Sequence, residues 1–317
     1  MAHTHPAPPT AYVGIDAGGS KTTLVARLGH DETTDVTLAG PAANPYRVGV
    51  EEAARVMAEL TSEALQSLPE AAAVSVCAGV AGAGRPDDQE SLTRYLRREL
   101  SGPLPLDVRV VHDGVIALEG AFDGGSGLIV IAGTGSLVLA RTEAGAVVRS
   151  GGWGYLFGDE GSGHALGTEG LRAVASALDG GPDTSLSTLL SERHDITTAE
   201  DLVQRVYREG WPVQHVAPLV IEAATEGDAV AHAILQDQTA RLAAQVAWTS
   251  GRCDAITPRI AFLGGLTNEA PYNAALAAAL GKKLPAWRVE KARHAPVYGA
   301  LRLALHLGDR QRIDSGG

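Results

Sequence analysis

Near the N-terminus, residues that could hold a phosphate and a metal ion lie between two apolar runs. The runs are residues 12–15 and Leu24–Ala26, and between them stand Asp16, Gly18, Gly19, Ser20, Lys21 and Thr22. This pattern predicts a strand, a tight turn and a second strand. Glycines let a backbone approach a phosphate, and the hydroxyls and local N–H groups can bond it. Asp16 would suit a hydrated Mg²⁺, although an ordinary hairpin turn would also use these glycines.

Two commoner phosphate-binding loops are excluded for this stretch. The Walker pattern places Lys directly after its second glycine, whereas Ser20 follows Gly19 and the next residues predict a strand. The dinucleotide fingerprint GxGxxG is also missing from residues 14–19.

A second turn of the same kind lies further along the chain. The apolar run Leu128–Ile131 leads into Gly133, Thr134, Gly135 and Ser136, and Leu137–Arg141 predicts the returning strand. Two such turns, in two similar α/β halves that face each other across a cleft, could clamp the phosphates of one nucleotide.

Asp113 is a candidate general base. It follows the predicted strand Leu106–Val111 and His112 and precedes the helical pattern Val115–Leu118. A carboxylate fixed at the edge of a sheet can accept a proton from a hydroxyl. An Asp between a strand and a helix is equally typical of an N-cap, and the sequence leaves both interpretations open.

The segment 151–163 is the most unusual in the chain. It contains six glycines, the adjacent carboxylates Asp159 and Glu160, and three of the 14 aromatic residues, and it fits neither helical nor strand periodicity. A flexible linker would not contain Trp153, Tyr155 and Phe157. An ordered loop of this length and composition is more often functional than structural.

Alternating strands and helices must position these residues. Strands are expected at 24–28, 35–38, 73–78 and 106–111, with helices at 50–68 and 87–100 between them. Such an order predicts an α/β sheet, in which ligands collect at the carboxyl ends of the strands. The second half predicts mostly helices, at residues 165–178, 184–192, 199–208, 216–226 and 229–250, and a closing helix over 298–307.

Length and composition set further limits. A chain of 317 residues with 45% hydrophobic residues is expected to form two domains. The net charge of −11 argues against nucleic-acid and anionic-membrane partners. Cys77 and Cys253 are the only cysteines, which disfavours a disulfide framework or a zinc site. No run reaches membrane-spanning length and residues 1–10 predict a disordered tail rather than a signal peptide, so a cytoplasmic protein is expected.

Taken together, these motifs resemble the N-acetylglucosamine kinase and BadF/BadG/BcrA/BcrD ATPase family of the actin-like sugar kinase superfamily. The resemblance rests on residues 14–22, the strand end at Asp113, residues 133–136, the two parts of the Gly-rich loop at 151–154 and 158–163, and the later stretches 262–266 and 296–301. It covers nearly the whole chain, in the order of the family.

The resemblance implies two ribonuclease-H-like α/β domains around a central nucleotide and sugar cleft, with ATP and Mg²⁺ inside. The implied divisions are residues 11–114, residues 115–295, and a closing helix within 296–317 that packs back on the first domain. Asp16 would hold the metal, Gly18–Thr22 and Gly133–Ser136 the phosphates, and Gly264 and Gly265 the adenosine. Asp113 would be the general base for a sugar 6-hydroxyl, with Asn44, Gly152 and Asp159 as further sugar contacts. An Asn-Pro turn would explain Asn44 equally well, and Gly264 and Gly265 could simply form a strand-to-helix turn.

The resemblance leaves the acceptor open. N-acetylglucosamine is the first expectation, with glucosamine or N-acetylmuramic acid as alternatives, and a homodimer is compatible with the family. The other branch of the family consists of ATPases that activate an acyl-CoA reductase or dehydratase through a bridging iron–sulfur cluster. That branch needs closely placed cysteines, so two isolated ones disfavour it. A regulator that binds nucleotide and sugar without turnover is disfavoured because Asp16 and Asp113 are both present.

Overall fold

The computed structural model describes residues 9–314, with side chains described as far as Asp309, and it contains two compact units. The first unit extends to Gly125 and includes the chain from Ala292 onward, and the second comprises Ser126–Lys291. Residues 1–8 of the expected tail lie outside the described residues. Thr10, which was assigned to that tail, already pairs with Ala73 as the first residue of a strand.

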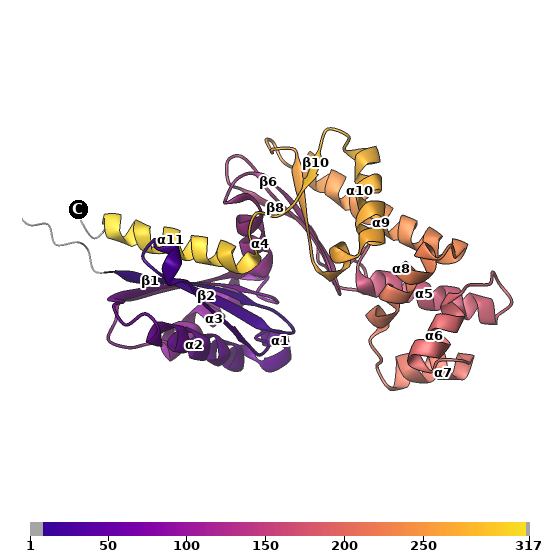
Figure 1. The fold of residues 1–317 in the computed structure, drawn as a ribbon, viewed down its shortest axis with the longest axis horizontal. Helices are drawn as coiled ribbons and strands as arrows, with labels where there is room; N and C mark the ends of the chain where they lie inside the picture. Colours follow the sequence, from indigo (N-terminus) through magenta and orange to yellow (C-terminus); the bar gives the residue numbers. More distant parts are fainter. Residues whose placement is uncertain (1–8, 315–317) are drawn as a thin grey trace, which may run out of the picture. The chain divides into compact units, whose positions relative to one another are not determined.

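The first unit is built on a five-stranded mixed sheet with the order β3-β2-β1-β4-β5 (Figure 1). Its strands are β1 (Thr10–Ala17), β2 (Thr22–Leu28), β3 (Val36–Gly40), β4 (Ala73–Val80) and β5 (Leu106–His112). The first three form an antiparallel meander, while β4 and β5 run parallel to β1. The carboxyl ends of β1, β4 and β5 therefore lie at one edge of the sheet, where Asp16 and Asp113 are found.

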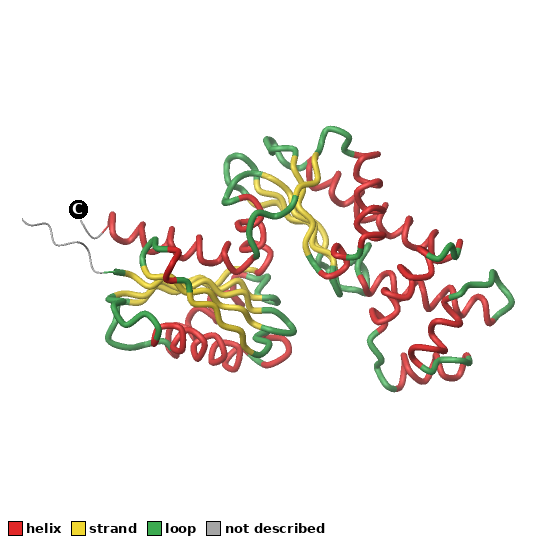
Figure 2. The backbone as a smooth tube through the Cα atoms, viewed as in Figure 1, coloured by secondary structure: helices red, strands yellow, loops and turns green. Residues whose placement is uncertain are grey.

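Helices cover both faces of this sheet (Figures 1 and 2). Val13, Ile15 and Leu24 face a core shared with α2 (Val50–Gln66) and α3 (Pro86–Glu99). Tyr12 and Val25 point to the opposite core, which is shared with α4 (Asp113–Phe122) and α11 (Pro296–Asp314). Because side chains alternate along a strand, an apolar run such as residues 12–15 can serve both cores. The short elements of this unit are η1 (Glu32–Thr34) and α1 (Pro45–Val48).

The closing helix α11 packs against β1 at Gly14. A Cβ on Gly14 would lie 2.3 Å from the backbone nitrogen of Leu301, so only glycine allows this approach. Ser75 donates a hydrogen bond to the carbonyl of Ala304 at 2.8 Å. The last segment of the chain thus completes the first unit.

The second unit repeats the same sheet order. Its sheet runs β10-β9-β6-β7-β8, with β6 (Gly127–Ala132) antiparallel to β7 (Ser136–Arg141) and parallel to β9 (Arg259–Leu263). The outer strands are β8 (Val147–Gly151) and β10 (Arg288–Glu290). Both units therefore have the ribonuclease-H-like strand order, which confirms the predicted fold class.

Helices dominate the rest of the second unit (Figure 1). They are α5 (Gly163–Leu178), α6 (Leu186–His194), α7 (Ala199–Val203), η2 (Gln204–Arg208), η3 (Val213–Val216), α8 (Ala217–Thr225), α9 (Ala229–Gly251), η4 (Gly265–Asn268) and α10 (Ala270–Lys283). The single helix expected over 199–208 is divided, because Gln204–Arg208 is wound as a π-helix. Among the described helices, none is long and apolar enough to cross a membrane.

Candidate active site

The first hairpin turn joins β1 and β2, as the glycine pattern predicted. Gly18 donates its backbone N–H to the carbonyl of Lys21 at 3.0 Å, which closes the turn. Thr22 is fully buried, and its hydroxyl donates to the carbonyl of Pro41 at 2.7 Å. In this structure the Thr22 hydroxyl therefore anchors the loop that carries Asn44, while Ser20 and Lys21 are exposed in the turn.

Asp16 stands at the end of β1, where its surroundings disfavour a charge. Burial, followed by repulsion from Asp113, raises the pKa of Asp16 to about 6, although Lys21 opposes the shift. The charges of Asp113 and Lys21 therefore both act on Asp16, and β4 lies between the strands that lead to Asp16 and Asp113. A cation can offset the repulsion between two carboxylates at one edge of a sheet. Mg²⁺ usually binds one or two carboxylates together with substrate phosphates.

Asp113 is the first residue of α4 and not its N-cap. The N-cap is His112, whose Nδ1 accepts a hydrogen bond from the backbone N–H of Gly114 at 3.0 Å. The Asp113 Oδ1 also accepts from this N–H at 2.8 Å, and the side chain remains 36% exposed. His112 is therefore the main cap of α4, and the Asp113 carboxylate can be reached from solvent.

Asn44 occupies the turn that leads into α1, as one of its two interpretations expected. It is the N-cap of α1, with its Oδ1 accepting from the N–H of Tyr46 at 2.9 Å. Its Nδ2 makes no hydrogen bond within residues 9–314 and lies 3.9 Å from the point where a Cβ on Gly19 would be. Arg47 donates to the carbonyl of Gly19 at 2.6 Å, so it places a cation beside the turn. Arg47 was missed because nothing in the sequence links it to a turn 28 residues earlier.

The second hairpin turn joins β6 and β7 and rests on the N-terminus of α5. Gly133 and Thr134 accept hydrogen bonds through their carbonyls from the N–H groups of Gly163 and His164, at 2.8 and 3.1 Å. The hydroxyl of Ser136 is nearly buried and donates to the carbonyl of Glu160 at 2.8 Å. Ser136 thus holds the Gly-rich loop, while Thr134 faces a pocket.

Asp159 and Gly152 lie against this second turn. A Cβ on Gly135 would lie 2.9 Å from Oδ2 of Asp159. The carboxyl group of Asp159 accepts hydrogen bonds from the backbones of Ser136 and Gly154, but burial outweighs them and raises its pKa. Gly152 donates to the carbonyl of Ser136 at 3.0 Å. The sugar contacts expected in this loop are therefore adjacent to the turn expected to bind phosphate.

Gly264 and Gly265 complete the same neighbourhood. Gly264 has a φ of +97°, and a Cβ there would lie 2.3 Å from the carbonyl oxygen of Ala132. The backbone nitrogen of Gly265 is 4.0 Å from a Cβ on Gly133, and a Cβ on Gly163 would be 3.5 Å from that of Gln214. The glycine pair, the second turn, the start of α5 and Gln214 therefore lie close to one another.

Replacing Gly264 by alanine should therefore destabilise the protein by roughly 1–3 kcal/mol or more. The alanine would be held in a left-handed conformation, and its Cβ would clash with the backbone of Ala132. Gly281 in α10 is the matched control, because a Cβ there meets nothing within 4 Å and alanine favours a helix. Urea unfolding of both variants measures the difference. Equal stabilities would contradict the close approach at Ala132.

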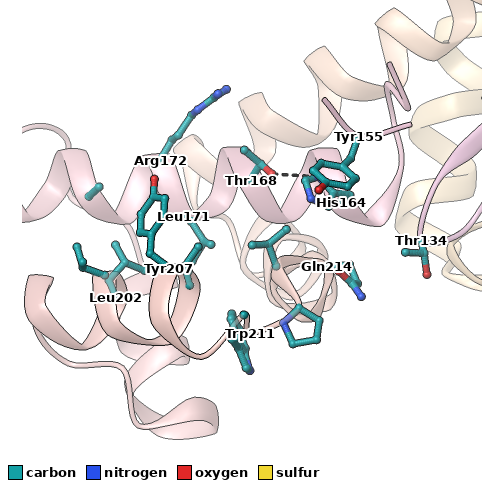
Figure 3. A pocket seen from close by; sticks show the side chains of 16 residues that line it. Thr134, Tyr155, His164, Thr168, Leu171, Arg172, Leu202, Tyr207, Trp211 and Gln214 are labelled. Atoms are coloured by element: carbon teal, nitrogen blue, oxygen red, sulfur yellow. Dashed lines mark hydrogen bonds between the residues drawn. The ribbon is translucent and has the colours of Figure 1, made fainter. Parts of the chain in front are cut away.

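A pocket of about 970 Å³ extends from Thr134 along α5 to α7 and η2 (Figure 3). Its polar end holds His164, which stacks on Tyr155 with ring centroids 4.4 Å apart and meets the Thr168 hydroxyl at 3.3 Å. Burial lowers the pKa of His164, partly offset by Asp159. The other lining residues include Leu171, Arg172, Leu202, Tyr207, Trp211 and Gln214. The sequence indicated only helices here, so this pocket was not predicted.

Comparisons with known proteins show the family to which this chain belongs. Residues 13–304 match the BadF/BadG/BcrA/BcrD ATPase family. The chain is 36% identical over 239 residues to an N-acetylmuramic acid/N-acetylglucosamine kinase of Clostridium acetobutylicum, covering 73% of this chain and 76% of the relative. It is 32% identical over 241 residues to an N-acetyl-D-glucosamine kinase of Dictyostelium discoideum, covering 71% and 75%.

A solved structure supports the fold. It comes from a Chromobacterium violaceum protein with a provisional N-acetylglucosamine kinase assignment, and it aligns with a TM-score of 0.72 and 24% identity over 93% of this chain and 98% of the other. The two ribonuclease-H-like units define the class of actin-like ATPases and sugar kinases. Within that class, the chain belongs to the BadF/BadG/BcrA/BcrD ATPase family, which confirms the resemblance drawn from the sequence.

Proposed function

We propose that this protein is an ATP-dependent kinase that phosphorylates the 6-hydroxyl of an amino sugar, with N-acetylglucosamine as the first candidate. The observation that carries the proposal is the partly exposed Asp113 carboxylate at the same edge of the first sheet as Asp16, whose pKa it helps to raise. The names of the two relatives favour N-acetylglucosamine and make N-acetylmuramic acid the next candidate. Glucosamine is a further alternative.

In this proposal each residue of the first unit has a distinct task. Asp113 accepts the proton of the sugar hydroxyl, a contribution of about 10²–10⁴-fold in general base catalysis. The Nδ2 group of Asn44 donates to a sugar hydroxyl. The first turn, with Lys21 and Arg47 beside it, orients phosphate oxygens. Asp16 would hold Mg²⁺, which supplies charge neutralisation for the transferring phosphoryl group when it is bound.

The second unit would bind the rest of the nucleotide. Gly133–Ser136 lie along the phosphates, Gly264 and Gly265 approach the adenosine, and Gly152 and Asp159 contact the sugar. The pocket that begins at Thr134 has the volume of a small-molecule site, for which about 300–1,000 Å³ is usual, so we assign the adenosine of ATP to the part of the pocket that follows Thr134, at His164 and Thr168.

A bulky residue in this pocket should therefore weaken ATP binding selectively. We expect Thr168→Trp to raise KM for ATP by at least about tenfold while KM for the sugar changes little. Ser176→Trp, on an exposed position of α5 outside the pocket, is the control. An unchanged KM for ATP in Thr168→Trp would show that the nucleotide does not bind in this pocket.

The other branch of the family stays disfavoured by its need for closely placed cysteines. Cys77 is buried in β4 and Cys253 is half-buried after α9. Within residues 9–314, no group of three or more His, Cys, Asp or Glu side chains could hold a metal ion by protein ligands alone. An iron–sulfur ATPase would need a cysteine cluster.

We also propose a location and partners for the kinase. Consumption of ATP supports the expected cytoplasmic location, and the net charge of −11 supports the absence of nucleic-acid or membrane partners. A homodimer, which the family allows, can be measured by light scattering.

The experiment that tests the proposed function is ADP release from Mg·ATP with glucose, glucosamine, N-acetylglucosamine or N-acetylmuramic acid. Release that depends on one amino sugar would support the kinase and identify its acceptor. Release that is independent of every sugar would contradict it and favour an ATPase.

A further inference from the structure

Asp159, in the turn that leads to Gly161, has a left-handed backbone conformation that costs a non-glycine residue free energy. Asp159 has a φ of +62° and Gly161 a φ of +74°. Among the described non-glycine residues, only Asp123 and Asp195 share such a φ, and both end a helix as C-caps. Asp159 has no helix end to explain its conformation. A strained residue of this kind persists only where its surroundings fix it.

Two buried side chains hold Gly161 from both sides of its backbone. Its N–H donates to Oε1 of Gln238 at 3.1 Å, and its carbonyl accepts from the hydroxyl of Tyr272 at 2.5 Å. Gln238 is 5% exposed and Tyr272 is fully buried. Burial raises the pKa of Tyr272 well above its usual value, so the phenol stays a donor. Gln238 is on α9 and Tyr272 on α10, both distant in sequence from the turn.

The hydrogen bonds to Gly161 affect the candidate site through the neighbouring residues Glu160 and Asp159. The carbonyl of Glu160 accepts the Ser136 hydroxyl, and its carboxylate accepts from Nε2 of Gln245. Asp159 in turn accepts backbone hydrogen bonds from Ser136 and Gly154. Leu242 fills the remaining space, since a Cβ on Gly161 would lie 2.9 Å from its Cβ. A shift of Gly161 would therefore move Asp159 relative to the second turn.

We infer that Gln238 and Tyr272 are positioning residues that set the Asp159 carboxylate against the second hairpin turn through Gly161. The inference rests on the proposed function for its effect on catalysis, whereas the mechanical link itself does not. In this inference each side chain acts on the site through its hydrogen bond to the backbone of Gly161.

Three variants test the link. Tyr272→Phe removes the hydroxyl that donates to Gly161, with little change in volume. Gln238→Met removes the oxygen that accepts from Gly161 together with the Nε2 donor to Asp237, and Gln238→Glu keeps an acceptor oxygen. Thr249→Val is the matched control, because Thr249 is a buried residue of α9 whose hydroxyl donates to the carbonyl of Gln245 in the same helix. Thermal unfolding reports the general cost of each change.

The first readout is kinetic. We expect Tyr272→Phe and Gln238→Met to lower kcat/KM for the sugar by at least about fivefold, mainly through KM, with Gln238→Glu closer to wild type. Thr249→Val should leave KM for the sugar unchanged, although its melting temperature should be similar to those of Tyr272→Phe and Gln238→Met. An unchanged KM in both Tyr272→Phe and Gln238→Met would overturn the inference and leave these side chains a structural role only.

The second measurement does not depend on catalytic activity. Hydrogen exchange of a peptide spanning residues 158–164 should be faster in Tyr272→Phe and Gln238→Met than in Thr249→Val. Unchanged exchange would overturn the link. If the wild-type protein phosphorylates none of the sugars while exchange behaves as expected, the proposed function fails and the positioning of Asp159 stands.

Discussion

Replacing Asp113 by asparagine is expected to lower turnover by about 10²–10⁴-fold, because the amide cannot accept the proton of a sugar hydroxyl. Binding of ATP should be nearly unchanged. Asp113 is the first residue of α4, His112 rather than Asp113 is the N-cap, and the carboxylate is partly exposed. The variant should therefore fold normally. Single-turnover measurements with saturating sugar separate the chemical step from product release.

Glu63→Gln, an exposed change on α2 of the same unit, controls for the loss of a negative charge. Its turnover should equal that of the wild type. Turnover of Asp113→Asn within a factor of about two of the wild type would remove Asp113 from the mechanism.

Asp16→Asn is expected to abolish activity and yet to stabilise the protein at pH 8 in the absence of Mg²⁺. The folded-state pKa of Asp16 is raised from 3.8 to about 6, so the folded protein binds the proton more tightly than the unfolded chain. Stability then falls as pH rises from about 4 to 6, and the full penalty is present above that range. Removing the charge should recover roughly 1–3 kcal/mol at pH 8, given 1.36 kcal/mol for each pKa unit.

Thermal unfolding of wild type and Asp16→Asn between pH 4 and pH 8 measures this effect, with the transition of each unit fitted separately because two domains need not unfold together. The advantage of the variant should shrink as pH falls toward 4. Glu70→Gln, an exposed change in the same unit, should show no such trend. A variant that is less stable than wild type at pH 8 would contradict the burial of a charged Asp16.

The sequence predicted the local parts of the site well, because hairpin turns depend on residues close together in the chain. Both Gly-rich turns lie where the apolar runs and glycines placed them, at residues 18–21 and 133–135. The fold class followed from the same pattern together with the family resemblance.

Other features depend on residues far apart in the chain and could not be predicted. Two of the expected phosphate-binding hydroxyls, on Thr22 and Ser136, turn inward to the carbonyls of Pro41 and Glu160. No local pattern distinguishes a hydroxyl that anchors a loop from one that faces a ligand. The contacts of Gln238 and Tyr272 with Gly161 span 77 and 111 residues. Helical periodicity identifies their helices but not which polar side chain faces a turn.

The central claim is transfer of a phosphoryl group from ATP to the 6-hydroxyl of an amino sugar. The most direct test is phosphorus NMR of the product formed from Mg·ATP and N-acetylglucosamine, with the 6-deoxy sugar as a control. The account predicts a phosphomonoester coupled to the two protons on carbon 6, and no sugar phosphate from the 6-deoxy compound. A product phosphorylated at carbon 1, or inorganic phosphate as the only product besides ADP, would contradict it.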